Sequence, residues 1–195
     1  YDHLLRPVER EIASASHVLT VPVGPLTYVP MGALLRSVEP KREYAVERFT
    51  FGVLPSMYLL DLALRDVPSW ATDALIVGDP DGTLPGARTE ARAVHARLSG
   101  ASSPLIGAAA TKAALRSQAE ASRVVHLATH GVLNPEAPES SYLVLADGQR
   151  LDVIDAMMLP LKQADLVVLS ACETGLGRSG MEYATLARAF AHAGV

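Results

Sequence analysis

Residues 165–171, Asp-Leu-Val-Val-Leu-Ser-Ala, predict the most apolar strand of the chain. The apolar residues at its centre do not alternate with polar ones. A strand of this kind is covered on both faces, as in the centre of a parallel sheet that has helices on either side. This stretch therefore indicates an α/β fold.

The rest of the chain after residue 73 supports the same fold, because predicted strands alternate there with predicted helices. Such alternation is typical of a mostly parallel sheet with helices on both faces. The expected strands cover residues 74–77, 103–106, 123–128, 142–146 and 165–171. The expected helices cover residues 89–98, 111–121, 151–158 and 181–192.

The first 64 residues have a less regular pattern. Apolar residues at helical spacing predict a helix within residues 1–15, and a β-branched run predicts a strand over residues 17–23. Residues 26–29 are expected to return as a hairpin partner. A short helix over residues 31–35, edge strands within residues 44–53 and a helix over residues 55–64 complete the prediction.

Composition excludes several classes of protein. Hydrophobic residues make up 49% of the 195 residues and charged residues 19%, which excludes an intrinsically disordered chain. The net charge of −4 and the lack of a long basic run argue against direct nucleic-acid binding. No apolar run approaches the roughly 18 residues that a spanning helix needs, so we expect no membrane anchor.

Cys172 is the only cysteine, so no internal disulfide and no multi-cysteine zinc site can form. This usage fits a reducing cytoplasm. The excess of Arg over Lys and the abundance of Ala are typical of a GC-rich bacterial genome. His126 and His130 would lie about 13 Å apart along one strand, too far to share a metal ion. We expect no metal and no cofactor.

Two reactive side chains follow predicted strands, at the edge where α/β proteins place their functional groups. His130 comes just after the strand at 123–128, and Cys172 comes just after the strand at 165–171. A nearby histidine raises the thiolate fraction of a cysteine and can protonate a leaving group. The backbone N–H groups of Gly131 and Cys172 are candidates for holding an oxyanion.

Position alone leaves two interpretations of this pair open. A lone cysteine at a strand end also occurs as an inert small apolar residue, and a lone histidine as a hydrogen-bonded structural one. Two other parts of the chain are expected to have structural roles only. His126 is expected to be a packed core residue, and residues 78–82, Gly-Asp-Pro-Asp-Gly, are expected to form a surface turn because they lack a phosphate-binding glycine pattern.

The segments around both reactive residues resemble the CHAT domain, a caspase-like family that is often joined to tetratricopeptide repeats in bacteria. The two motifs are Val-His-Leu-Ala-Thr-His-Gly at residues 125–131 and Leu-Ser-Ala-Cys-Glu-Thr-Gly at residues 169–175. Weaker matches are spread along the rest of the sequence, so the resemblance extends over essentially the whole chain. They lie at residues 21–26, 29–30, 54–56 and 84–87, and at Glu90, Ser141, Leu143 and Leu145.

The resemblance implies a caspase-like α/β fold and the activity of a cysteine endopeptidase, a hydrolase. By the same resemblance, His130 is the catalytic base and acid, Cys172 is the nucleophile and Gly131 contributes to the oxyanion hole. The segment around Cys172 differs from the Gln-Ala-Cys-x-Gly pattern of the caspases proper. The resemblance therefore does not imply cleavage after aspartate.

The resemblance also predicts the extent of the domain. We expect residues 1–195 to form a single CHAT domain that is truncated at its C-terminal end and excised from a longer chain. The chain begins without Met, and it stops at Val195, where the sheet of the family continues with another strand.

Two functions from different classes are expected to compete. The leading one is a cysteine endopeptidase that cleaves a protein partner in the cytoplasm, under the control of an adjacent repeat domain or a partner protein. The alternative is a non-catalytic, caspase-like interaction or signalling domain. The presence of both His130 and Cys172 argues for the endopeptidase.

Overall fold

The computed structural model describes residues 1–54, 56–57, 60, 73–98, 102–134, 136–172 and 181–195. It divides the chain into two compact units, Tyr1–Ala63 and Leu64–Val195. Most of the helix expected over residues 55–64 lies outside the described residues. The expectation of a single, truncated domain over residues 1–195 stays a prediction.

The first unit contains two small two-stranded sheets. Strand β1 (His17–Thr20) pairs in parallel with β4 (Thr50–Val53), and β2 (Leu35–Ser37) pairs antiparallel with β3 (Glu43–Tyr44). Short 3₁₀ helices precede and connect these strands. They are η1 (Arg6–Val8), η2 (Gly24–Tyr28), η3 (Met31–Ala33) and η4 (Ala45–Glu47).

Two predictions for this unit were wrong, each beside a proline. The helix expected within residues 1–15 is limited to η1 and turns, because Pro7 has no N–H to continue a helical hydrogen-bond pattern. The hairpin strand expected at residues 26–29 is instead part of η2. Gly24, with φ of 57°, and Pro25 in the first turn direct the chain into this helix.

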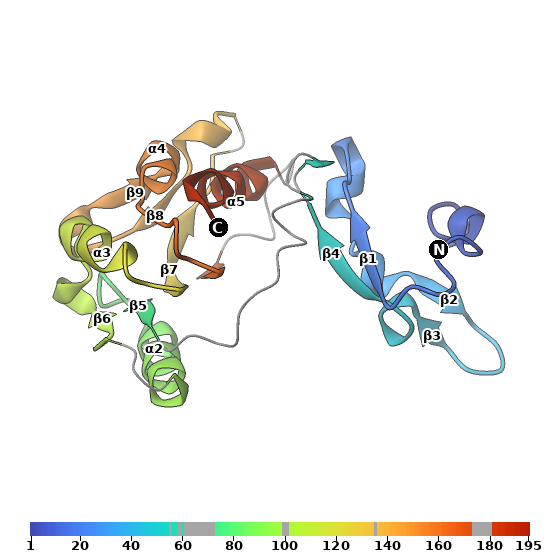
Figure 1. Ribbon diagram of the computed structural model, residues 1–195, viewed down its shortest axis with the longest axis horizontal. Helices are drawn as coiled ribbons and strands as arrows, with labels where there is room; N and C mark the ends of the chain where they lie inside the picture. Colours follow the sequence, from blue (N-terminus) through green and yellow to red (C-terminus); the bar gives the residue numbers. More distant parts are fainter. Residues whose placement is uncertain (55, 58–59, 61–72, 99–101, 135, 173–180) are drawn as a thin grey trace. The chain divides into compact units, whose positions relative to one another are not determined.

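The second unit is built around a mixed six-stranded sheet (Figure 1). Strands β6 (Leu105–Ile106), β5 (Ala74–Gly78), β7 (Val124–Val132) and β10 (Leu166–Cys172) are parallel neighbours in this order. The last residues of β7 pair antiparallel with β8 (Tyr142–Val144), which in turn pairs with β9 (Arg150–Asp152). The predicted mostly parallel sheet is thus confirmed for its centre.

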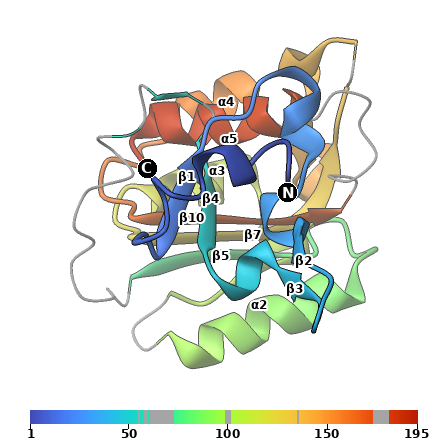
Figure 2. The ribbon, with the colours of Figure 1, turned by 90° about the vertical axis from the view of Figure 1, so that its right-hand side faces the viewer.

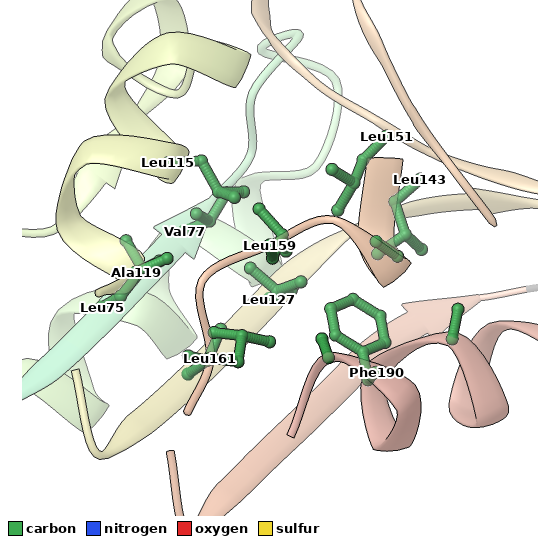
Figure 3. Close-up of a cluster of buried hydrophobic side chains, with 14 of the residues drawn as sticks. Leu75, Val77, Leu115, Ala119, Leu127, Leu143, Leu151, Leu159, Leu161 and Phe190 are labelled. Carbon is green, nitrogen blue, oxygen red and sulfur yellow. The ribbon is translucent and has the colours of Figure 1, made fainter. Parts of the chain in front are cut away.

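Helices cover both faces of this sheet, as expected (Figure 2). Helix α2 (Pro85–Arg97) lies on one face, where Ala91 packs with Ala74, Ile76 and Val124. The larger core lies on the other face, under the remaining helices (Figure 3). These helices are α3 (Lys112–Ala119), α4 (Val153–Met157) and α5 (Met181–Ala193).

The hairpin of β8 and β9 was not predicted, because the segment after Tyr142 was expected to hold a single strand. Asp147 and Gly148 have φ angles of 57° and 70°, and the N–H of Gln149 donates to the carbonyl of Ala146. Two consecutive left-handed residues form the type I′ turn that favours a tight antiparallel hairpin.

Among the described residues, no helix is long and apolar enough to cross a membrane.

Candidate active site

The backbone pairing of β7 with β10 brings the two expected reactive residues together. The strands are parallel, and Cys172 is the register partner of His130. Adjacent strands lie about 5 Å apart, so the two backbone positions are direct neighbours at the carboxyl edge of the parallel strands. The structure describes the backbone of Cys172, and the expected glycine-rich loop over residues 173–180 lies outside the described residues.

His130 differs from the prediction in one respect: it lies inside a strand and not after one. Strand β7 does not end at residue 128 but continues to Val132. It does so because Gly131 and Val132 gain new partners, Leu143 and Tyr142 of β8, beyond the end of β5. The backbone around His130 therefore pairs with β10 at His130 itself and with β8 at the two residues that follow. This pairing fixes the position of the His130 Cα atom.

The imidazole of His130 contacts a loop that follows β5. Its Nε2 atom lies 2.8 Å from Thr83 Oγ1 and 3.9 Å from Asp81 Oδ2. The carboxylate of Asp81 also accepts hydrogen bonds from the hydroxyl and the backbone N–H of Thr83, at 2.8 and 3.2 Å. The His130 side chain is 38% exposed, so it is open to solvent and to a substrate.

Asp79 anchors this loop to the sheet and to α2. Its side chain is 1% exposed and accepts hydrogen bonds from the Leu84 N–H at 2.7 Å and from Arg88 Nε at 3.0 Å. Its own N–H donates to the Ala128 carbonyl of β7. Asp79 adopts a φ of 50°, in the left-handed region, which turns the chain sharply away from the strand. These bonds hold Thr83 beside His130.

Burial of Asp81 on its own raises the pKa of that carboxyl. The two hydrogen bonds from Thr83 and the charge of His130 act in the opposite direction and outweigh burial, so the pKa of Asp81 is lowered. A carboxylate with a lowered pKa stays ionised wherever a histidine titrates. The loop thus presents a permanent negative charge to the imidazole.

A second polar cluster lies on the same face of β7, beneath α2. His126 Nε2 donates to Glu90 Oε1 at 2.9 Å, and Ser170 Oγ donates to Glu90 Oε2 at 3.1 Å. The expectation that His126 is a packed core residue is confirmed, since it is 6% exposed. Ser170 lies two residues before Cys172, so positions 170 and 172 belong to one face of β10.

Gly131, the expected oxyanion residue, is buried and pairs with Leu143 of β8. Beside it, the Thr129 hydroxyl donates to the Val144 carbonyl at 2.7 Å, on the opposite face of β7 from His130. The structure therefore fixes the backbone around Gly131. Its part in an oxyanion hole stays a prediction.

Sequence reasoning missed Asp81 and Thr83 as neighbours of His130. The expected surface turn over residues 78–82 is wrong for Asp79, which is buried and ion-paired with Arg88 at 2.8 Å. One signal was available: the segment follows a parallel strand at the same edge as His130, where functional groups gather.

Within the described ranges, no group of three or more His, Cys, Asp or Glu side chains could hold a metal ion.

Comparison with known proteins gives a family for the whole chain. The family model described as the CHAT domain matches residues 1–195. No curated protein matches the chain.

Proposed function

The chain belongs to the CHAT domain family, and from this membership and the site we propose that it is a caspase-like cysteine endopeptidase, with Cys172 as nucleophile and His130 as base and acid. The observation that carries the proposal is the register of β7 and β10, in which His130 and Cys172 are partners. The α/β architecture of the second unit, with its mixed and mostly parallel sheet, supports a caspase-like fold.

In the first half of the reaction, His130 accepts the proton of the Cys172 thiol, and the thiolate attacks the carbonyl carbon of the peptide bond. A sulfur–carbon bond forms, and the carbonyl oxygen becomes an oxyanion that the backbone N–H groups of Gly131 and Cys172 stabilise. His130 then donates its proton to the nitrogen of the leaving amine as the carbon–nitrogen bond breaks.

In the second half, water attacks the resulting thioester. His130 takes a proton from the water as the new carbon–oxygen bond forms. The sulfur–carbon bond then breaks, which releases the peptide acid, and the proton on His130 returns to the sulfur. The solvent exposure of the His130 side chain supports this step, because water reaches the imidazole directly.

The substrate and the regulation belong to the same proposal. The chain cleaves a protein partner, and an adjacent repeat domain or a partner protein controls the cleavage, because an uncontrolled endopeptidase would damage the cell. It acts in a bacterial cytoplasm, a location that suits a reduced Cys172, the only cysteine in the sequence.

The first test measures alkylation of Cys172 by iodoacetamide at neutral pH, with the labelled peptide identified by mass spectrometry. Because His130 raises the thiolate fraction, Cys172 should react faster than a free thiol of pKa about 8.5, and His130→Ala should slow it about tenfold. His192→Ala, on the exposed side of α5, is the matched control and should leave the rate unchanged.

The second test looks for cleavage itself. The chain is produced together with the proteins encoded beside it, and new fragments are sought by mass spectrometry. Fragments that form with the unaltered chain and disappear with Cys172→Ala support the endopeptidase. Equal alkylation with and without His130, and no fragment that depends on Cys172, would leave the non-catalytic interaction domain as the function.

A further inference from the structure

The hydroxyl of Thr83 lies between a carboxylate and the imidazole of His130, and it carries only one hydrogen. Two acceptors compete for that hydrogen: Asp81 Oδ1 at 2.8 Å and His130 Nε2 at 2.8 Å. An ionised carboxylate is the stronger acceptor, so the hydroxyl donates to Asp81. Thr83 Oγ1 can then only accept from the imidazole.

This hydrogen-bond direction fixes which nitrogen of His130 carries the proton. Since Thr83 Oγ1 accepts, Nε2 must be the donor, and the neutral imidazole has its proton on Nε2. The other ring nitrogen, Nδ1, is left with a free lone pair. A base needs such a lone pair to accept the proton of a thiol.

We propose that Thr83 and Asp81 are positioning residues of His130: they hold its neutral ring as the Nε2–H tautomer, with Nδ1 free to take the proton of Cys172, and they stabilise the imidazolium that results. This proposal rests on the proposed function. The chain of contacts runs from carboxylate to hydroxyl to imidazole, so the negative charge of Asp81 acts through Thr83 as well as directly over 3.9 Å.

Among the described residues, Asp81 is the charged side chain in contact with Nε2 of His130. Asp79, the nearest other carboxylate on the loop, is paired with Arg88. On α2, Glu90 is engaged by His126 and Ser170. Of the titratable groups in the part of the chain that the structure describes, Cys172 on β10 is the backbone neighbour of His130, and it is the group that His130 would deprotonate.

A direct test measures the tautomer by nitrogen NMR on the full chain labelled with ¹⁵N-histidine. The chain has six histidines, and the signals of His130 are identified as those that are missing from the spectrum of His130→Ala. We expect a pyrrole-type shift for Nε2 of His130 and a pyridine-type shift for Nδ1 when the ring is neutral. The opposite pattern would overturn the proposal, and this result does not depend on whether the chain cleaves any substrate.

The second test compares the pH profile of Cys172 alkylation by iodoacetamide among variants. Thr83→Val removes the hydroxyl at constant shape, and we expect the apparent pKa of the thiol to rise by about one unit and the rate at pH 7 to fall about tenfold. Thr83→Ser keeps the hydroxyl and should stay within about twofold of the unaltered chain. Asp81→Asn keeps an acceptor but loses the charge, so its rate should lie between these two.

Controls separate positioning from folding and from the proposed function. Thr89→Val removes another exposed threonine hydroxyl, one that donates to the Pro85 carbonyl, and it should leave the profile unchanged. If His130→Ala slows alkylation but Thr83→Val does not, the positioning role is wrong while the endopeptidase stands. If Thr83→Ser is as slow as Thr83→Val, the hydroxyl is not the cause and the proposal also fails. If His130→Ala itself has no effect, the proposed function fails first.

Discussion

Glu90 joins α2 to two neighbouring strands through one carboxylate. Its two oxygens accept from His126 of β7 and from Ser170 of β10. The His126 side chain is only 8% exposed, so water has little access to its nitrogen if the carboxylate is removed. A buried donor left without an acceptor costs free energy, because the bond that it makes to water in the unfolded chain is not replaced.

Replacing Glu90 should therefore lower the stability of the fold. We expect Glu90→Ala to reduce the free energy of unfolding by about 1–2 kcal/mol, at the lower end of the cost of a lost acceptor, because Glu90 itself is partly exposed. Glu90→Gln keeps an acceptor and should cost less. Urea unfolding followed by circular dichroism measures both.

Glu120→Ala, at an exposed position beyond α3, is the matched control and should change stability by less than about 0.5 kcal/mol. If Glu90→Ala and Glu120→Ala unfold at the same urea concentration, the cluster does not stabilise the sheet.

Single residues also show how far sequence reasoning reaches at the site. The motifs around His130 and Cys172 were sufficient to expect both residues at one edge of a sheet, and the register of β7 with β10 confirms that they are backbone neighbours. Thr83 could not be found in this way. Its contact with His130 spans 47 positions and depends on the left-handed backbone of Asp79 and on the buried pair of Asp79 with Arg88.

Among the elements, α2 and β5 pack unusually closely at Gly78. A methyl group added there would lie 2.5 Å from Ala91 Cβ and 3.0 Å from the Ala87 carbonyl oxygen, both on α2. Real side chains do not approach so closely, so the helix or the strand would have to move. Gly86, within α2, has no atom within 4 Å of such a methyl group.

The two glycines make a matched pair of substitutions. Gly78→Ala should lower the free energy of unfolding by about 1–3 kcal/mol, through overpacking between helix and sheet. Gly86→Ala should be neutral or stabilise by up to about 1 kcal/mol, since alanine has the higher helix propensity and restricts the unfolded chain. Thermal and urea unfolding of both variants measure the difference, and equal stability of the two would contradict the close packing.

At the same scale, the central elements were predictable and the hairpin of β8 and β9 was not. The strand expected at residues 165–171 and the helix expected at residues 111–121 were both confirmed. Each has a local cause: a continuous apolar run for the strand, and for the helix the Thr111 hydroxyl, which accepts the Ala114 N–H. The signal for the hairpin was also local, in the pair Asp147-Gly148. It was missed because β8 and β9 are only three residues long, too short for a pattern of alternation.

Over the whole molecule, the buried side chains separate by unit. Two hydrophobic clusters of described residues lie one on each face of the six-stranded sheet, and their members come from Ala74 onward. Among the described residues of the first unit, the buried apolar side chains are Leu5, Ala45, Phe49 and Leu54. The residues proposed for the reaction and for positioning, from Asp81 to Cys172, all belong to the second unit.

This separation predicts that the second unit carries the reactive pair by itself. A variant that begins at residue 64 retains both clusters and the whole contact chain from Asp81 through Thr83 to His130. We expect it to unfold cooperatively and to keep the alkylation rate of Cys172 and its dependence on His130. Cleavage of a protein partner is a separate measurement, because a long substrate can also contact residues 1–63. If Cys172 in the shortened variant reacts like a free thiol while its circular dichroism stays that of a folded α/β protein, the first unit contributes to the site. The prediction would then be wrong.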